Sequence, residues 1–312
     1  MTRAVMVRRA FQVALLAFVA WYVARHWGEY EHVLSAARPD WGAIARSCAL
    51  VFISYLVLIQ TWRQTVQAWG EHLSFADGAR IWFISNLGKY VPGKVWAIAA
   101  MGTLAREAGI SPVAAVGSSL VVQLVNIVTG FGVFVVAGAH VMQLPGGSTA
   151  AFVALALALV CTPWLVPFAV RTLNRVSSRQ FAVPHLPARA LWWAGAGTTV
   201  AWVLYGVAFQ WFVAGISGGA NAGAAAGTTG DWIAIFVGPY LLGFVALFSP
   251  GGLGVREGAM LVALEQAGLA TGALAALLVT ASRLWLTVLE IIPGVLFLLI
   301  HPANRRISSN DT

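Results

Sequence analysis

Charged residues are scarce in this sequence. Asp, Glu, Lys and Arg make up 10% of its 312 residues, whereas hydrophobic residues make up 59% and mean hydropathy is +0.79. A soluble chain usually carries about 25% charged residues. Because so few charges cannot cover the water-facing surface of a fold this large, the sequence predicts that lipid surrounds most of the chain.

Metal-binding and redox motifs are also lacking. The two cysteines, Cys48 and Cys161, lie inside apolar runs, which argues against a disulfide framework or a zinc site. The six histidines show no metal-ligand spacing, and no phosphate-binding loop is present. We therefore expect no catalytic residues, no cofactor and no metal. The net charge of +8 comes mainly from arginines that flank apolar runs, so a nucleic-acid partner is not expected either.

Long apolar runs organise the chain. Six are long enough to cross about 30 Å of hydrocarbon: 10–27, 43–62, 112–139, 150–170, 190–216 and 272–300. The first has a basic start but no small-residue cleavage site, which is typical of a retained signal anchor. Two further apolar stretches, 80–107 and 233–267, are interrupted in the middle by Pro92-Gly93 and by Pro250-Gly251-Gly252.

The interruptions predict two helical hairpins. Proline lacks an amide hydrogen and glycine loosens a helix, so each stretch is expected to form two short helices joined by a turn. Such a turn is tolerated at membrane depth only where protein or a cavity encloses it. The alternative is a kinked helix that crosses the membrane.

The distribution of Lys and Arg predicts the topology. Eleven basic residues lie in the N-terminus, 63–80, 171–189 and the C-terminus, whereas 28–42, 140–149 and 217–230 hold only Arg38. By the positive-inside rule, the first group is cytoplasmic. Run 112–139 must then lead out of the cytoplasm, and run 272–300 must lead back into it. Both directions are possible only if the two interrupted stretches re-enter the membrane, each from the opposite side. We expect an all-α polytopic membrane protein with six spanning helices and two re-entrant hairpins, which a window count would report as seven or eight spans.

The two interrupted stretches resemble each other. Pro92-Gly93 is followed by Ala108-Gly109-Ile110 and a long helix, and Pro250-Gly251 is followed by Ala267-Gly268-Leu269 and a long helix. The sequence therefore predicts one transmembrane domain, 1–312, with an inverted repeat whose halves are about 43–139 and 190–300. Inverted repeats are typical of secondary transporters.

Positive charges gather at the interruptions. A helix that restarts after each break directs unpaired amide hydrogens and the positive end of its dipole into the protein. Lys89 and Lys94 bracket the first break, Arg256 follows the second, and Arg283 lies well inside the last run. Charges at this depth usually face a partner or a wet cavity. Helix ends and cations together predict a site for a phosphate-bearing ligand.

Other polar residues leave alternatives open. Glu257 and Glu290 are candidates for neutralising Arg256 and Arg283, and Glu257 is also a candidate proton-coupling carboxylate. The amides of Asn86, Gln123 and Asn126 are candidates for lining the cavity or for joining membrane helices. Trp202 and four other tryptophans are expected to be packing or interface residues.

Two windows carry a family resemblance. Residues 85–96 (SNLGKYVPGKVW) and 250–258 (PGGLGVREG), with Arg283 as a third matching position, resemble the transmembrane region of lysylphosphatidylglycerol synthases. That region also occurs as a stand-alone, flippase-like family. The resemblance implies a bacterial inner-membrane protein that moves a lipid or a lipid-linked headgroup between leaflets. Because the chain stops at Thr312 without a synthase domain, aminoacyl-lipid synthesis is not expected.

Three functions remain in view. We expect a transporter that flips an anionic phospholipid or a polyprenyl-phosphate-linked molecule across the bacterial inner membrane, with both termini cytoplasmic and membrane lipids as partners. The alternatives are an integral-membrane enzyme that acts on a lipid headgroup and a non-transporting accessory protein of envelope synthesis. Chemical change of the lipid distinguishes the enzyme from the transporter.

Overall fold

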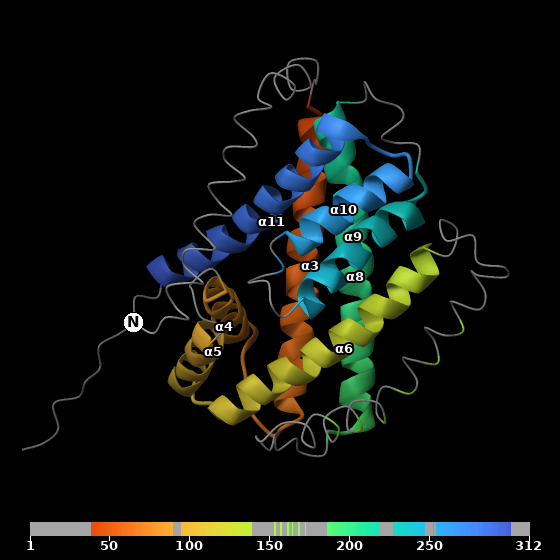
Figure 1. Ribbon diagram of the computed structural model, residues 1–312. Coiled ribbons are helices and arrows are strands. Elements are labelled where there is room, and N and C mark those ends of the chain that lie inside the picture. Colours follow the sequence, from red (N-terminus) through yellow and green to blue (C-terminus); the bar gives the residue numbers. More distant parts are fainter. Residues whose placement is uncertain are drawn as a thin grey trace, which may run out of the picture.

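The computed structural model is helical throughout the part it describes, as Figure 1 shows. That part comprises residues 39–89, 95–138, 186–218, 227–246 and 254–300, together with single positions between 153 and 172 and residue 252. Its eight helices are α3 (Trp41–Gln67), α4 (Phe75–Leu87), α5 (Val95–Glu107), α6 (Pro112–Gly138), α8 (Ala188–Ser217), α9 (Thr229–Val245), α10 (Val255–Gln266) and α11 (Gly272–Ile300).

Four of these helices are long and apolar enough to cross a membrane. Helices α3, α6, α8 and α11 contain 27 to 30 residues each, which gives lengths of about 40–45 Å. The predictions of apolar helices at 43–62, 112–139, 190–216 and 272–300 are thereby confirmed. The predicted run 10–27 lies outside the described residues. So does most of run 150–170, in which Cys161, Phe168 and the other described positions are helical.

The other four helices form two antiparallel pairs. Helices α4, α5 and α10, with 12 or 13 residues each, are only about 18–20 Å long, which is too short to cross the hydrocarbon layer. Arg80 of α4 contacts Glu107 at the end of α5 with 2.9 Å between Nη2 and Oε2, so α5 returns to the end where α4 began. In the second pair, a Cβ built on Gly227 before α9 would meet Leu269 after α10 at 3.0 Å.

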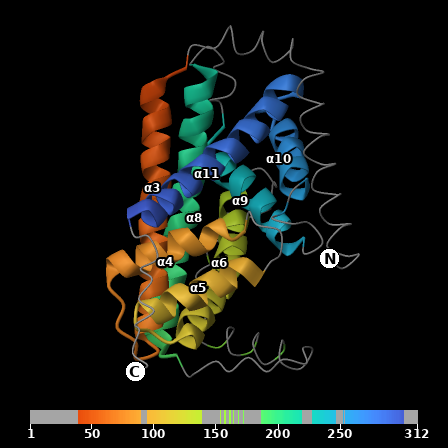
Figure 2. The same ribbon diagram turned by 90° about the vertical axis from the view of Figure 1, so that its left-hand side faces the viewer.

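The long helices α3 and α8 pack against each other in opposite directions. The Asp40 amide donates to the Gly215 carbonyl at 2.9 Å, and the Ser47 hydroxyl donates to the Ala208 carbonyl at 2.7 Å. Further along, Thr61 lies against Gly197. The outer end of the α4–α5 pair follows the end of α3, whereas the outer end of the α9–α10 pair follows the end of α8. The two pairs therefore approach the bundle from opposite ends (Figures 1 and 2).

The helix contacts are unchanged when the two halves of the chain are exchanged. Replacing α3, α4, α5 and α6 by α8, α9, α10 and α11, and the reverse, converts each pair of helices in more than marginal contact into another such pair. Thus α6 packs on α9 as α11 packs on α4, and α8 packs on α9 as α3 packs on α4. The α3–α8 pair alone converts into itself.

The two short pairs also end in the same local structure. Gly109 and Gly268 have φ angles of 77° and 64°, which favour glycine because a side chain is strained there. The Ile110 amide donates to the Ala105 carbonyl at 3.0 Å, and the Leu269 amide donates to the Leu264 carbonyl at 3.1 Å. This is the hydrogen bond of a Schellman cap. The repeated Ala-Gly tripeptides in the sequence thus correspond to matching helix ends.

Close backbone contact is found at the inner ends of both pairs. A Cβ on Gly88 would lie 2.6 Å from the Ala97 amide nitrogen, and a Cβ on Gly252 would lie 2.7 Å from the Gly243 carbonyl oxygen. Gly252 also has a φ of 70°. Only a residue without a side chain fits at either position without displacing this backbone.

We predict that Gly252→Ala destabilises the protein by about 1–3 kcal/mol, because alanine is strained at this φ and meets the Gly243 carbonyl. Gly258→Ala is the matched control, since a Cβ there meets nothing within 4 Å. Thermal unfolding of the purified variants in detergent measures the difference. Equal melting temperatures for the two variants would contradict the tight packing of this turn.

Candidate functional site

An ion pair joins the inner end of the first short pair to α11. Lys89, two residues after α4 ends, pairs through Nζ with Oε2 of Glu290. The Lys89 side chain is 41% exposed and that of Glu290 is 18% exposed. Glu290 belongs to α11, which is long and apolar enough to cross a membrane. A lone carboxylate inside a membrane-spanning helix costs free energy, so Lys89 and Glu290 stabilise each other.

A second ion pair joins the inner end of the other short pair to the same helix. Nη1 of Arg283 lies 3.6 Å from Oε1 of Glu257, in the first turn of α10. The other carboxylate oxygen of Glu257 accepts a 2.7 Å hydrogen bond from the Gly254 amide. Glu257 therefore caps α10 and occupies part of the helix end that the sequence offered to an external anion.

Both partners on α11 lie on one face of that helix. Arg283 and Glu290 are seven residues apart, which places them two turns, or about 10.5 Å, from each other along the axis. The sequence left open a pairing between these two residues. The structure instead pairs Arg283 with Glu257 and Glu290 with Lys89, so α11 is tied to both short pairs.

Arg256 is the third cation and has a different environment. It is buried, with 6% of its surface exposed, and Nη2 makes no hydrogen bond within the described part of the chain. Its guanidinium lies 4.9 Å from the ring centroid of Tyr240 and 5.6 Å from that of Phe236, both on α9. Aromatic faces attract a cation but do not neutralise it. This group of three cations and two carboxylates therefore carries one surplus positive charge.

A cavity of about 140 Å³ lies beside these groups. Six helices or their ends line it, and the polar lining residues are Tyr55, Asn86, Lys89, Ser119, Gln123, Asn126, Tyr205, Tyr240 and Glu290. Tyr240 is shared, because its side chain lines the cavity and its ring also contacts Arg256. Arg256 is thus one aromatic ring away from the cavity.

Several predicted site residues meet at this cavity. Asn86, Lys89, Gln123, Asn126 and Glu290 all line it, although α4, α6 and α11 are far apart in sequence. Arg256, Glu257 and Arg283 form the adjoining charged group and do not line the cavity. Of the residues at the breaks, Gly252 lies against Gly243 as described above, whereas Pro92, Gly93, Lys94, Pro250 and Gly251 are outside the described residues.

The aromatic wall of the cavity was not among the predicted site residues. Trp62, Trp82 and Trp202 contribute to it together with three tyrosines. The indole N–H of Trp62 donates to the Ala115 carbonyl, and that of Trp202 donates to the Asn126 carbonyl. Trp202 therefore packs as expected and also lines the cavity. Three of the six tyrosines in the sequence line this cavity. A tyrosine inside an apolar run is the sequence signal that could have revealed this aromatic wall.

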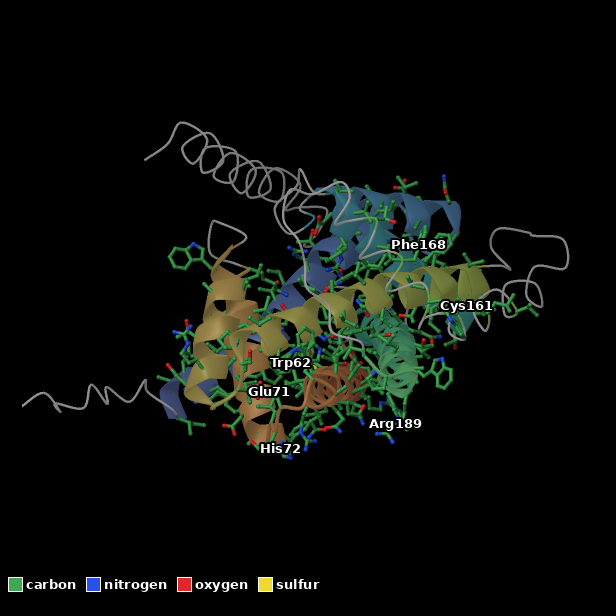
Figure 3. All side chains as sticks on the ribbon, turned by 90° about the horizontal axis from the view of Figure 1, so that it is seen from below. Trp62, Glu71, His72, Cys161, Phe168 and Arg189 are labelled. Atoms are coloured by element: carbon green, nitrogen blue, oxygen red, sulfur yellow. The ribbon has the colours of Figure 1, made fainter. Side chains whose placement is uncertain are left out.

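Figure 3 views the bundle from the end at which Glu71 and His72 connect α3 to α4 and Arg189 begins α8. In that view Trp62 lies inside the group of helices, whereas Arg189 lies at its outer edge. Trp62 is fully buried. Trp62 therefore belongs to the inner wall of the cavity, whereas the exposed Lys89 lies on its outer side.

The fold and the cavity define a multi-pass helical membrane protein with a polar, charged interior. Comparison with protein families finds a match to the lysylphosphatidylglycerol synthase TM region over residues 9–290. The chain belongs to this family. Residues 291–312 hold no synthase domain. No match was found among curated proteins or among solved structures.

We predict that Lys89 and Glu290 are energetically coupled. Lys89→Gln and Glu290→Gln each remove one member of this ion pair, so the double variant should be more stable than the sum of the single effects implies, by about 1–3 kcal/mol. The Arg46–Asp40 pair, with 3.8 Å between Nη2 and Oδ2 and with both side chains more than half exposed, is the control and should couple by less than about 1 kcal/mol. Thermal unfolding of the four members of each cycle measures both couplings. Strictly additive effects at Lys89 and Glu290 would contradict the pairing.

Proposed function

We propose that this protein is a lipid translocator that moves an anionic lipid or a lipid-linked phosphate between the leaflets of the bacterial inner membrane. Membership of a family with flippase-like members supports a lipid as substrate. The observation that carries the proposal is Arg256, a buried arginine that pairs with no carboxylate in the described part of the chain and lies one ring away from a polar cavity.

The electrostatics of Arg256 favour an anionic ligand. An unpaired charge in a low-dielectric interior is costly, and an incoming anion reduces that cost. Glu257 is held by the Gly254 amide and by Arg283, and Glu290 is held by Lys89. The carboxylates already have partners, so the surplus positive charge is available to the phosphate of a lipid. Arginine binds phosphate through two parallel hydrogen bonds.

We further propose that the two short pairs are re-entrant hairpins of an inverted repeat. Three features support this arrangement: the short helices return to the end where they began, the equivalent helices α3 and α8 are antiparallel, and exchange of the halves preserves the contacts. A two-fold relation between antiparallel spans places its axis in the membrane plane. The halves can then exchange inward-facing and outward-facing roles.

Single cysteines test this topology. Arg106→Cys and Glu265→Cys, in a background without Cys48 and Cys161, occupy matching exposed positions near the ends of α5 and α10. The positive-inside rule predicts that the residue at 106 is cytoplasmic. An impermeant thiol reagent added to intact cells should therefore label the Glu265→Cys variant and not the Arg106→Cys variant. Labelling of both on one side of the membrane would exclude the inverted repeat.

Arg256→Gln tests the function itself. The substitution keeps much of the side-chain bulk and removes the charge, so the rate of phosphatidylglycerol translocation in proteoliposomes should fall about tenfold or more. Thermal stability should be maintained or raised, because a buried unpaired charge is removed. A fluorescent acyl-labelled lipid and a membrane-impermeant quencher measure the rate.

Two comparisons make this experiment decisive. Arg106→Gln removes an exposed arginine near the end of α5 and should leave translocation unchanged. Arg256→Lys retains the charge and should restore part of the rate. A wild-type rate in Arg256→Gln would refute the assignment of Arg256 to the ligand. Chemical conversion of the labelled lipid, detected by mass spectrometry, would instead identify an enzyme.

A further inference from the structure

Three side-chain amides in the cavity make no hydrogen bond within the described part of the chain. Asn86 comes from α4, and Gln123 and Asn126 come from α6. The hydroxyl groups of Tyr205 and Tyr240 likewise make none there. All five residues are half-buried and line the cavity, so these donors and acceptors face it without a partner in the described part of the chain. A polar ligand in the cavity can serve as their partner.

The chemistry of these groups restricts that partner. Each amide offers a carbonyl acceptor and two N–H donors, and each phenol offers one donor and two lone pairs. A hydroxyl is also both donor and acceptor, so it matches either end of an amide. Among the described residues, the one carboxylate that lines the cavity is Glu290, which is already paired with Lys89. A cationic headgroup would therefore lack a free counter-charge at this place.

The remaining wall suits the carbon skeleton of a polyol. The indole N–H groups of Trp62 and Trp202 are bound to backbone carbonyls, so these side chains present apolar ring surface. At about 140 Å³ the cavity is smaller than the 300–1,000 Å³ typical of pockets for drug-sized ligands. It can hold a headgroup but not the acyl chains, which remain in the bilayer.

We propose that the cavity recognises a headgroup rich in hydroxyl groups, a glycerol or a sugar, through Asn86, Gln123 and Asn126. This inference rests on the proposed function only in assigning the cavity to a lipid headgroup. The phosphate lies toward Arg256 on the far side of Tyr240, and the hydroxyls lie among the amides. Arg256 thus selects lipids that carry a negative charge, and the three amides select among those lipids by their headgroup hydroxyls.

A matched pair of lipids tests the proposal. Dihexanoyl-phosphatidylglycerol and dihexanoyl-phosphatidylpropanol have the same charge and nearly the same size, and only the first has headgroup hydroxyls. Binding is measured by isothermal titration calorimetry to the full chain in nanodiscs of zwitterionic lipid. Phosphatidylglycerol should bind about tenfold more tightly, because phosphatidylpropanol leaves the amides unpaired. Dihexanoyl-phosphatidylinositol, with a ring of hydroxyls, distinguishes a sugar-sized site from a glycerol-sized one.

Substitutions locate the preference. Gln123→Leu and Asn126→Leu should each reduce the ratio of the two affinities several-fold while binding of phosphatidylpropanol is retained. Gln210→Leu is the matched control, because Gln210 is an amide of α8 that does not line the cavity. It should leave the ratio unchanged. If a leucine variant does not fold, the comparison of the two lipids on the wild-type protein still tests the proposal.

The possible outcomes separate this inference from the proposed function. Equal affinity of the wild-type protein for the two lipids would overturn the inference. Tighter binding of a choline or ethanolamine lipid would also overturn it and would indicate recognition of a cation by the aromatic rings. A preference for phosphatidylglycerol in binding, without movement of any lipid in proteoliposomes, would support the inference and refute the translocator.

Discussion

Backbone that leaves a helix inside the hydrocarbon layer must find its hydrogen-bond partners within the protein. Helices α4, α5 and α10 are too short to cross the membrane, so this constraint governs their ends wherever these lie at membrane depth. Gly88, at the end of α4, and Gly252, before α10, lie against the backbone of Ala97 and of Gly243. Cations lie next to these helix ends, and ion pairs to α11 satisfy two of them.

The charged residues then connect these inner ends to one helix. Lys89 and Glu257 reach α11 at points two turns apart, through Glu290 and Arg283. Arg256 remains without a carboxylate and contacts the ring of Tyr240, which also lines the cavity. A single helix, α11, therefore contacts the inner ends of both short pairs.

Much of the architecture was predictable from the sequence. The apolar runs gave the four long helices because hydrophobic length is set by the membrane alone. The residues at the cavity were predictable as polar outliers in apolar runs, as Asn86, Gln123 and Asn126 show.

The ion-pair partners were not predictable. Lys89 and Glu290 are 201 residues apart, and only the packing of α11 on α4 brings them together. Sequence proximity favoured Arg283 with Glu290, but a separation of two helical turns is too long for a direct contact. The shielding of Arg256 by Tyr240 was hidden for the same reason, since tertiary packing and not sequence spacing decides which ring covers a cation.

The α3–α8 pair, which converts into itself when the two halves are exchanged, bears on the free-energy difference between the two states of a transporter. If the halves exchange roles, this antiparallel pair is one that both end states have in common, so it can serve as a fixed frame for the change. The free-energy difference arises only where the halves are unlike. One inner end has a cation paired with a carboxylate, Lys89 with Glu290, and the other has Arg256 against aromatic rings. In the proposed translocator, this inequality would make the two end states unequal in free energy, and an anion bound near Arg256 would change that difference.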